Sequence, residues 1–206
     1  PFVFGKSREG DSRETYAQGM KYFIIFTLLA FLAVMFYLDI LRHLIGRGYW
    51  EGLRVVPIVM MAEIFMGVYF NLSFWYKLTD ETRWGALFSL AGCTVLVALN
   101  VLLIPRLGYM ACAWAGFAGY GTAMLLSYFV GQRRYPIRYD LKAIGLYVLL
   151  AAVLYALAMY VPIDNLWLRL LWRTILLLAF LAYIIRRDLP LSQWPVIGKY
   201  FAKRKG

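Results

Sequence analysis

Charged residues and histidine are scarce in this chain of 206 residues. Only 16% of the residues are charged and His43 is the single histidine, whereas 63% are hydrophobic. A soluble domain is about one quarter charged and about half apolar, and one soluble core of this size could not bury the excess. The composition therefore predicts that lipid surrounds much of the chain.

Cysteine is also rare, since the chain has only Cys93 and Cys112, both within apolar runs. No CxxC pair is present, and with one histidine the sequence lacks the usual ligand pattern of a zinc site. We therefore expect no metal ion and no cofactor, and we interpret both cysteines as small buried packing residues. No Ser/His/Asp arrangement can be assembled around His43, so we predict no catalytic residue and no enzyme.

Acidic residues are outnumbered by basic ones, 11 against 22, which gives a net charge of +11. A basic chain can bind nucleic acid, but these charges lie in short patches between long apolar runs. Such a distribution is typical of membrane topology. We therefore expect no nucleic-acid partner.

Apolar segments long enough to cross a bilayer recur along the sequence, since a spanning helix needs about 20 residues at about 1.5 Å each. The pattern predicts an all-α, polytopic bundle of six transmembrane spans. The last span carries Arg169 and Arg173 near its start, and we expect both to reach the membrane interface. The predicted spans are residues 22–38, 55–76, 84–105, 107–132, 143–163 and 166–185.

Lysine and arginine are divided unevenly between the two sides that six spans would create. Sixteen lie on the side that holds both chain ends and six on the other, so the positive-inside rule places both ends in the cytoplasm. The basic tail is expected on anionic lipid of the inner leaflet or in solvent. The predicted segments are an N-terminal cytoplasmic segment 1–21, a four-helix part 22–132, a cytoplasmic link 133–142, a last helix pair 143–185 and a cytoplasmic tail 186–206.

Small residues recur every four positions in two of the predicted spans. Such ridges let helices approach closely in lipid, so we interpret them as packing surfaces without a ligand. The ridges are Ala111, Ala115, Gly119 and Ala123 in one span, and Gly85, Ser89 and Cys93 in the other.

Glu63 is the most unusual residue, because it lies inside the span 55–76 with no basic partner in that segment. It is either protonated or hydrogen-bonded to a neighbouring helix, or it faces a water-filled cavity and binds a coupling cation or proton. Asn71 shares its helix face through Gly67, at i, i+4 and i+8. We expect Asn71 to link helices by hydrogen bonding, and this face to meet protein or water.

Lys77 and Arg83 flank a short polar turn, "WYKLTDETRWG" at residues 75–85. Both are candidate ligands for an anionic headgroup or phosphate. The alternative is a capped cytoplasmic turn whose charges only fix topology.

Longer stretches carry a family resemblance. "GYWEGLRVVPIVMMAEIFMGVYFNLSFWYKLTDETRWGA", "LNVLLIPRLGYMACAWA" and "SYFVGQRRYPIRYDLK" resemble the C-terminal part of bacterial polysaccharide-biosynthesis proteins. These are the lipopolysaccharide O-antigen flippases of the multidrug/oligosaccharidyl-lipid/polysaccharide (MATE-like) exporter superfamily. The chain also begins at Pro1 without an initiator Met, so we interpret it as the C-terminal lobe of a longer protein.

The resemblance implies transport of undecaprenyl-diphosphate-linked oligosaccharide across the bacterial inner membrane by alternating access. The implied partners are that lipid-linked sugar, membrane lipid and the N-terminal lobe of the same protein. The last helix pair, 143–163 and 166–185, would help to form a groove for the lipid tail. Glu63 matches no motif of the family, so a coupling role for it does not follow from the resemblance.

Two other functions stay open at this point. A cation-coupled multidrug antiporter of the same superfamily would favour acidic and aromatic cavity residues, and only one acid lies within a span. A membrane-bound polysaccharide polymerase or ligase would need a sizeable outer loop, and the outer links are short. A structural membrane subunit without transport activity is a further alternative.

Overall fold

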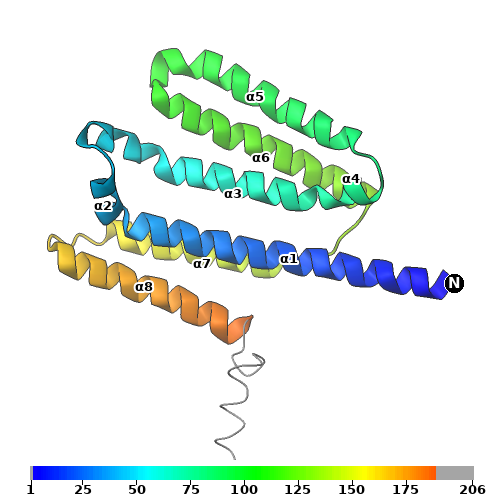
Figure 1. The fold of residues 1–206 in the computed structure, drawn as a ribbon. Helices are drawn as coiled ribbons and strands as arrows, with labels where there is room; N and C mark the ends of the chain where they lie inside the picture. Colours follow the sequence, from blue (N-terminus) through cyan, green and yellow to red (C-terminus); the bar gives the residue numbers. More distant parts are fainter. Residues whose placement is uncertain (1, 189–206) are drawn as a thin grey trace, which may run out of the picture.

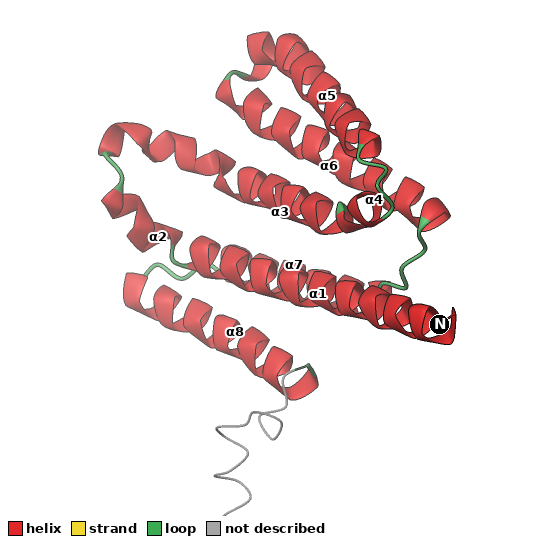
Figure 2. Ribbon diagram, turned by 45° about the vertical axis from the view of Figure 1, so that its right-hand side comes forward, coloured by secondary structure: helices red, strands yellow, loops and turns green. Residues whose placement is uncertain are grey.

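The computed structural model describes residues 2–188, with side chains from residue 13 onward. All regular elements of residues 2–188 are helices (Figure 2), which confirms the predicted all-α class. They are α1 (Phe2–Phe36), α2 (Leu38–Leu41), two 3₁₀ segments (Arg42–Leu44 and Arg47–Val55), α3 (Val56–Leu72), α4 (Phe74–Leu78), α5 (Arg83–Leu107), α6 (Tyr109–Arg134), α7 (Leu141–Tyr160) and α8 (Leu166–Arg187).

Among the described residues, five helical stretches are long and apolar enough to cross a membrane: Arg13–Phe36, Arg47–Leu78, Arg83–Leu107, Leu141–Tyr160 and Leu166–Arg187. The chain is therefore a membrane protein. Helix α6 has 26 residues and is not one of the five. Its apolar residues are interrupted by glycine, tyrosine and hydroxyl-bearing residues, which lower its mean hydropathy. The predicted fourth span, 107–132, thus remains a prediction.

The N-terminal segment is helical and is not a loop outside the bundle. Helix α1 begins at Phe2, so most of the predicted N-terminal segment 1–21 continues the first membrane helix. No proline occurs between Pro1 and Pro57 to interrupt it. The predicted behaviour of the tail concerns residues 189–206, which lie outside the described residues.

The long helices form two groups (Figure 1). Helix α6 packs between α3 and α5, and this set is the α3/α5/α6 group. Helices α7 and α8 pack on α1 and on each other, and they form the α1/α7/α8 group. The groups meet where α1 contacts α3. There the ring of Phe23 covers Gly67 so closely that a Cβ atom at position 67 would overlap it.

Side-chain contacts identify two ends of the bundle. At the Lys21 end, Lys21 pairs with Asp188 just after α8, and Arg134 at the end of α6 pairs with Glu81 before α5. At the Asp39 end, the residues after α1 contact the start of α8. Consecutive long helices therefore run in opposite directions between these two ends, as short connections require.

The predicted small ridge on α6 is confirmed as a packing surface. Ala111, Ala115, Gly119 and Ala123 are all buried. A Cβ atom on Gly119 would lie 2.9 Å from the carbonyl oxygen of Gly92 on α5, so the two backbones touch. Close approach of this kind is how small residues hold helices together in lipid.

The predicted ridge on α5 is confirmed only in part. Gly85 packs closely, since a Cβ atom there would lie 2.9 Å from the Tyr76 ring, but the glycine of α5 that touches α6 is Gly92, and Cys93 is exposed. Ser89 is exposed as well, but its hydroxyl hydrogen-bonds to Tyr69 on α3 at 2.9 Å. Cys112 is also exposed, so the expectation that both cysteines are buried packing residues is wrong.

Candidate functional site

Glu63 lies near the middle of α3, and its side chain is exposed on the described chain. No hydrogen bond or ion pair joins it to another residue among 13–188, so the predicted bond to a neighbouring helix does not occur there. Val59 and Phe70, at helical spacing from it, are exposed as well, at 38% and 56%. This outward stripe is called the open face of α3 (Val59, Glu63 and Phe70).

Asn71 is half-buried, and its amide nitrogen donates to the Gly67 carbonyl oxygen of the same helix at 3.0 Å. The predicted hydrogen bond between helices is therefore wrong for the amide nitrogen, which bonds to a backbone acceptor one turn earlier in its own helix. Gly67 meets Phe23 of α1. The structure thus places Glu63, Gly67 and Asn71 along one side of α3, and only Glu63 is left open.

Lys77 and Arg83 lie at the Lys21 end, and both are exposed. The Lys77 ammonium lies 5.9 Å from the centre of the Phe74 ring, and neither cation forms an ion pair with another residue in 13–188. Their positions suit contact with an anionic group from the membrane surface, but the structure does not bring them next to Glu63. The four predicted site residues therefore fall into two places: Glu63 and Asn71 lie on α3, whereas Lys77 on α4 and Arg83 at the start of α5 lie beyond its C-terminal end.

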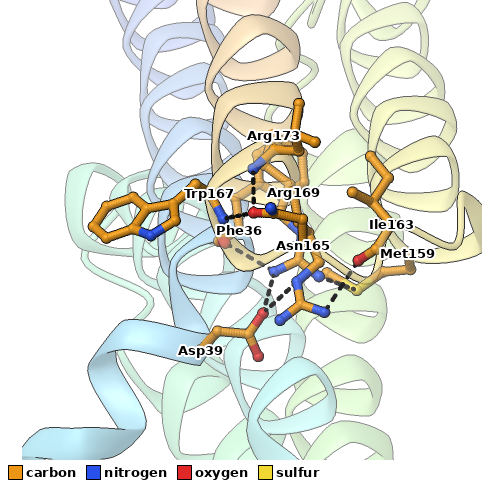
Figure 3. A network of polar contacts seen from close by, with 9 residues as sticks. Phe36, Asp39, Met159, Ile163, Asn165, Trp167, Arg169 and Arg173 are labelled. Carbon is orange, nitrogen blue, oxygen red and sulfur yellow. Dashed lines mark hydrogen bonds and ion pairs between the residues drawn. The ribbon is translucent and has the colours of Figure 1, made fainter.

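Arg169 and Arg173, expected at the membrane interface, share the carboxylate of Asp39 at one end of the bundle (Figure 3). The Asp39 Oδ2 atom lies 3.1 Å from Arg169 Nε and 2.9 Å from Arg173 Nη1. Arg173 is buried and also donates to the Phe36 carbonyl oxygen at 3.1 Å. Asn165 caps the same end of α8 by accepting from the Trp167 backbone N–H at 2.9 Å.

A second polar cluster fastens α8 at the Lys21 end. Asp188 pairs with the Lys21 ammonium and accepts a hydrogen bond from the Tyr147 hydroxyl. Burial of Asp188 favours its neutral form, but the hydrogen bonds from Lys21 and Tyr147 and the charges of Lys21 and Arg187 outweigh that effect, so its pKa lies below the ordinary value. The carboxylate is therefore ionised near neutral pH and holds α1, α7 and α8 together.

Neither cluster was predicted from the sequence. Asp39 and Arg173 are separated by 134 positions, and Lys21 and Asp188 by 167. A single sequence contains no signal that pairs such distant residues. The available hint was that Arg169 and Arg173 lie inside an apolar segment, where an arginine requires a partner or the interface.

An apolar groove lies between the two helix groups. It has two adjoining parts of about 310 Å³ and about 330 Å³, which share Leu28, Met61 and Val148. Its lining comes from α1, α3, α6 and α7. No α8 residue lines it, whereas the resemblance implies a groove to which both α7 and α8 contribute. Phe65 and Val68 line it on α3, on the side opposite Glu63 at about 100° per residue.

Comparisons with known proteins give no relative: no family model, curated protein or solved structure matches the chain.

Proposed function

We propose that the chain forms the C-terminal lobe of a flippase for undecaprenyl-diphosphate-linked oligosaccharide in the bacterial inner membrane. The proposal combines the resemblance of residues 48–86, 99–115 and 127–142 with the membrane-spanning helices and with the position of Glu63. It includes all six predicted spans, α6 among them, and places both ends in the cytoplasm. The Lys21 end is then the cytoplasmic end of the bundle.

The open face of α3 is the observation that carries this proposal. A carboxylate near the centre of a membrane helix costs about 3 kcal/mol when it faces hydrocarbon. Glu63 has no partner in residues 13–188, so we infer that water or another part of the protein covers this face in the membrane. A lobe whose polar face borders a passage to a second lobe is the arrangement that alternating access requires.

The chemistry of such a passage follows from the cargo. A sugar headgroup cannot cross hydrocarbon alone, because each unpaired polar group there costs several kcal/mol. A polar passage replaces water around the headgroup while the lipid tail stays in the membrane. No covalent bond changes, so the proposal requires no catalytic residue. Lys77 and Arg83, exposed at the proposed cytoplasmic end, are placed to meet the diphosphate as it enters.

A cation-coupled multidrug antiporter is the second candidate, and one observation favours it. Glu63 is free of any cation in residues 13–188, and a free membrane carboxylate can bind a coupling proton or metal cation. Both candidates therefore make Glu63 essential, and they differ in the cargo.

Substitution of Glu63 tests the proposal in the full-length protein. We expect Glu63→Gln to lower surface polysaccharide at least tenfold while protein level and thermal stability stay within the wild-type range. Glu51→Gln is the matched control, because Glu51 is exposed in the 3₁₀ segment before α3 and lies in the same apolar stretch. Normal polysaccharide in the Glu63→Gln strain would contradict the proposal. Loss of drug resistance with normal polysaccharide would support the antiporter.

A further inference from the structure

One face of α1 carries two different linings in succession. Near the Lys21 end it lines a polar pocket of about 600 Å³ together with residues 136–140, the link between α6 and α7. From Met20 onward, the same face lines the apolar groove. Residues of and next to the link also divide between the two cavities: Arg138 and Asp140 line the polar pocket, whereas Tyr139 and Leu141 line the apolar groove. The pocket and the groove share no lining residue, but neighbouring residues of both elements, Met20 and Lys21 on α1 and residues 138–141 in and after the link, place them next to each other.

The groove is somewhat longer than one leaflet. Its lining runs from Met20 to Phe31 on α1, from Pro57 to Leu72 on α3 and from Leu141 to Tyr155 on α7, and these stretches rise about 16 to 22 Å. Half of a bilayer's hydrocarbon core measures about 15 Å, so the groove reaches from the Lys21 end to the region of the bilayer centre. The lining is almost entirely apolar along this length, so the groove suits an acyl chain that ends near the bilayer centre. It offers no polar route for a headgroup to cross.

The polar pocket has charges of both signs. Three cations line it, Arg13, Lys21 and Arg138, together with two carboxylates, Glu14 and Asp140. These cations are not equally engaged, because Lys21 pairs with Asp188 and the Arg13 guanidinium stacks on the Tyr135 ring at 4.1 Å. The buried Nε atom of Arg13 has no hydrogen-bond partner. One oxygen of Asp140 caps α7 by accepting from the Ala143 backbone N–H.

Tyr139 marks the boundary between pocket and groove. Burial raises the pKa of its phenol to about 12, so the side chain stays neutral where the headgroup region ends.

We propose that this composite site binds one phospholipid of the leaflet at the Lys21 end, with a phosphoethanolamine headgroup. Its phosphate is matched by Arg13 and Arg138, since guanidinium groups are the strongest phosphate partners among side chains. Its primary ammonium is matched by Glu14 and by the second oxygen of Asp140. A purely anionic headgroup would leave these two carboxylates facing negative charge. One acyl chain fills the groove, which is too short for a long polyprenyl tail.

This inference requires only that the chain lies in a membrane, and it does not depend on transport. Native mass spectrometry of the delipidated full chain, with one lipid added at a time, tests it. The probes are phosphatidylethanolamine, phosphatidylcholine, phosphatidylglycerol and undecaprenyl phosphate. We expect phosphatidylethanolamine to bind about tenfold more tightly than the other three, the ratio that one charge-assisted hydrogen bond gives. Equal binding of all four, or preferred binding of undecaprenyl phosphate, would overturn the proposal.

Two substitutions separate this site from general lipid adhesion. Glu14→Gln keeps the side-chain shape, and we expect it to abolish the preference for phosphatidylethanolamine over phosphatidylglycerol. Ile144→Trp is expected to fill the groove and to lower binding of every diacyl lipid at least fivefold. Arg133→Met is the matched control, because Arg133 is exposed at the same end and does not line the pocket. If Glu14→Gln retains both wild-type melting temperature and wild-type lipid preference, the assignment is wrong.

Discussion

The two helix groups are held together by different forces. In the α3/α5/α6 group the backbones touch, as at Gly92 and Gly119, and the large buried side chains gather in one cluster beside this contact, formed by Tyr69, Trp75, Tyr76 and Phe88. Its ion pair, Arg134–Glu81, is partly exposed. In the α1/α7/α8 group large side chains such as Phe36, Tyr147 and Phe180 are fully buried. Charged clusters then fasten that group at both ends, around Asp39 and around Asp188.

This difference follows from helix packing without a hydrophobic driving force. Lipid tails are as apolar as leucine, so helices in a membrane associate through close van der Waals contact and polar bonds. Glycine and alanine allow close van der Waals contact between helix backbones, and such contacts require no charged side chains. Bulky side chains keep helix backbones further apart, and α1, α7 and α8 add ion pairs at the bundle ends. The groove lies between the two groups, where neither kind of contact is continuous.

Removal of Asp39 should destabilise the α1/α7/α8 group more than a substitution at Gly119 or at Asp188. Asp39→Ala leaves Arg169 and the buried Arg173 without their carboxylate, and loss of one partner of a buried pair costs about 3 kcal/mol or more. We expect the melting temperature in detergent to fall and amide exchange to rise in α8 but not in α5 or α6. The double variant Asp39→Leu with Arg173→Met should recover much of the loss. Equal exchange in both groups would contradict the division.

The second largest loss of stability is expected from a substitution at the contact between α5 and α6. Gly119→Ala places a methyl group 2.9 Å from the Gly92 carbonyl oxygen, and such overpacking costs about 1–3 kcal/mol. Gly116→Ala on the same helix meets nothing within 4 Å. It should stabilise the protein by about 0.5–1 kcal/mol, because alanine favours helix over glycine. Thermal melts of both variants measure this opposite sign, and a shift of equal sign would refute the packing role of Gly119.

Acid should have a smaller effect, confined to the Lys21 end. The folded-state pKa of Asp188 lies below its ordinary value of 3.8, so the carboxylate stabilises the fold at pH above about 4 and loses that contribution as the pH falls further. The contribution of the Asp188 carboxylate is measured by comparing the melting temperatures of wild type and Asp188→Asn between pH 7 and pH 3. The gap between the two proteins should narrow below pH 4, whereas a gap independent of pH would exclude an ionic role.

The helices and the packing surface of α6 could be predicted because they follow from local sequence patterns. Apolar runs placed the helices, and the four-residue repeat from Ala111 to Ala123 identified a real packing surface. The repeat on α5 included Gly85, which packs under the Tyr76 ring, but missed Gly92, which touches Gly119 of α6, because the position of the neighbouring helix does not follow from the repeat. Asn71 was assigned to another helix although its own backbone offers a nearer acceptor.

The remaining site residues depend on contacts that no local pattern encodes. Asp39 meets Arg173 only when α8 folds back along α1. The polar pocket likewise forms only when residues 13–21 meet the link 136–140. By contrast, Glu63 could be singled out at once, since an acid inside an apolar helix requires an explanation in any fold.

Water access at position 63 tests the central claim most directly. Glu63→Cys, in the full-length protein with Cys93→Ser and Cys112→Ser, should react with a membrane-impermeant maleimide, because only a thiol in contact with water forms the reactive thiolate. Val101→Cys is the control, since Val101 is 70% exposed on the outer side of α5 and should stay unlabelled in lipid. Labelling at 63 and not at 101 is the predicted result. A thiol at position 63 as unreactive as one at 101 would contradict a polar passage beside α3.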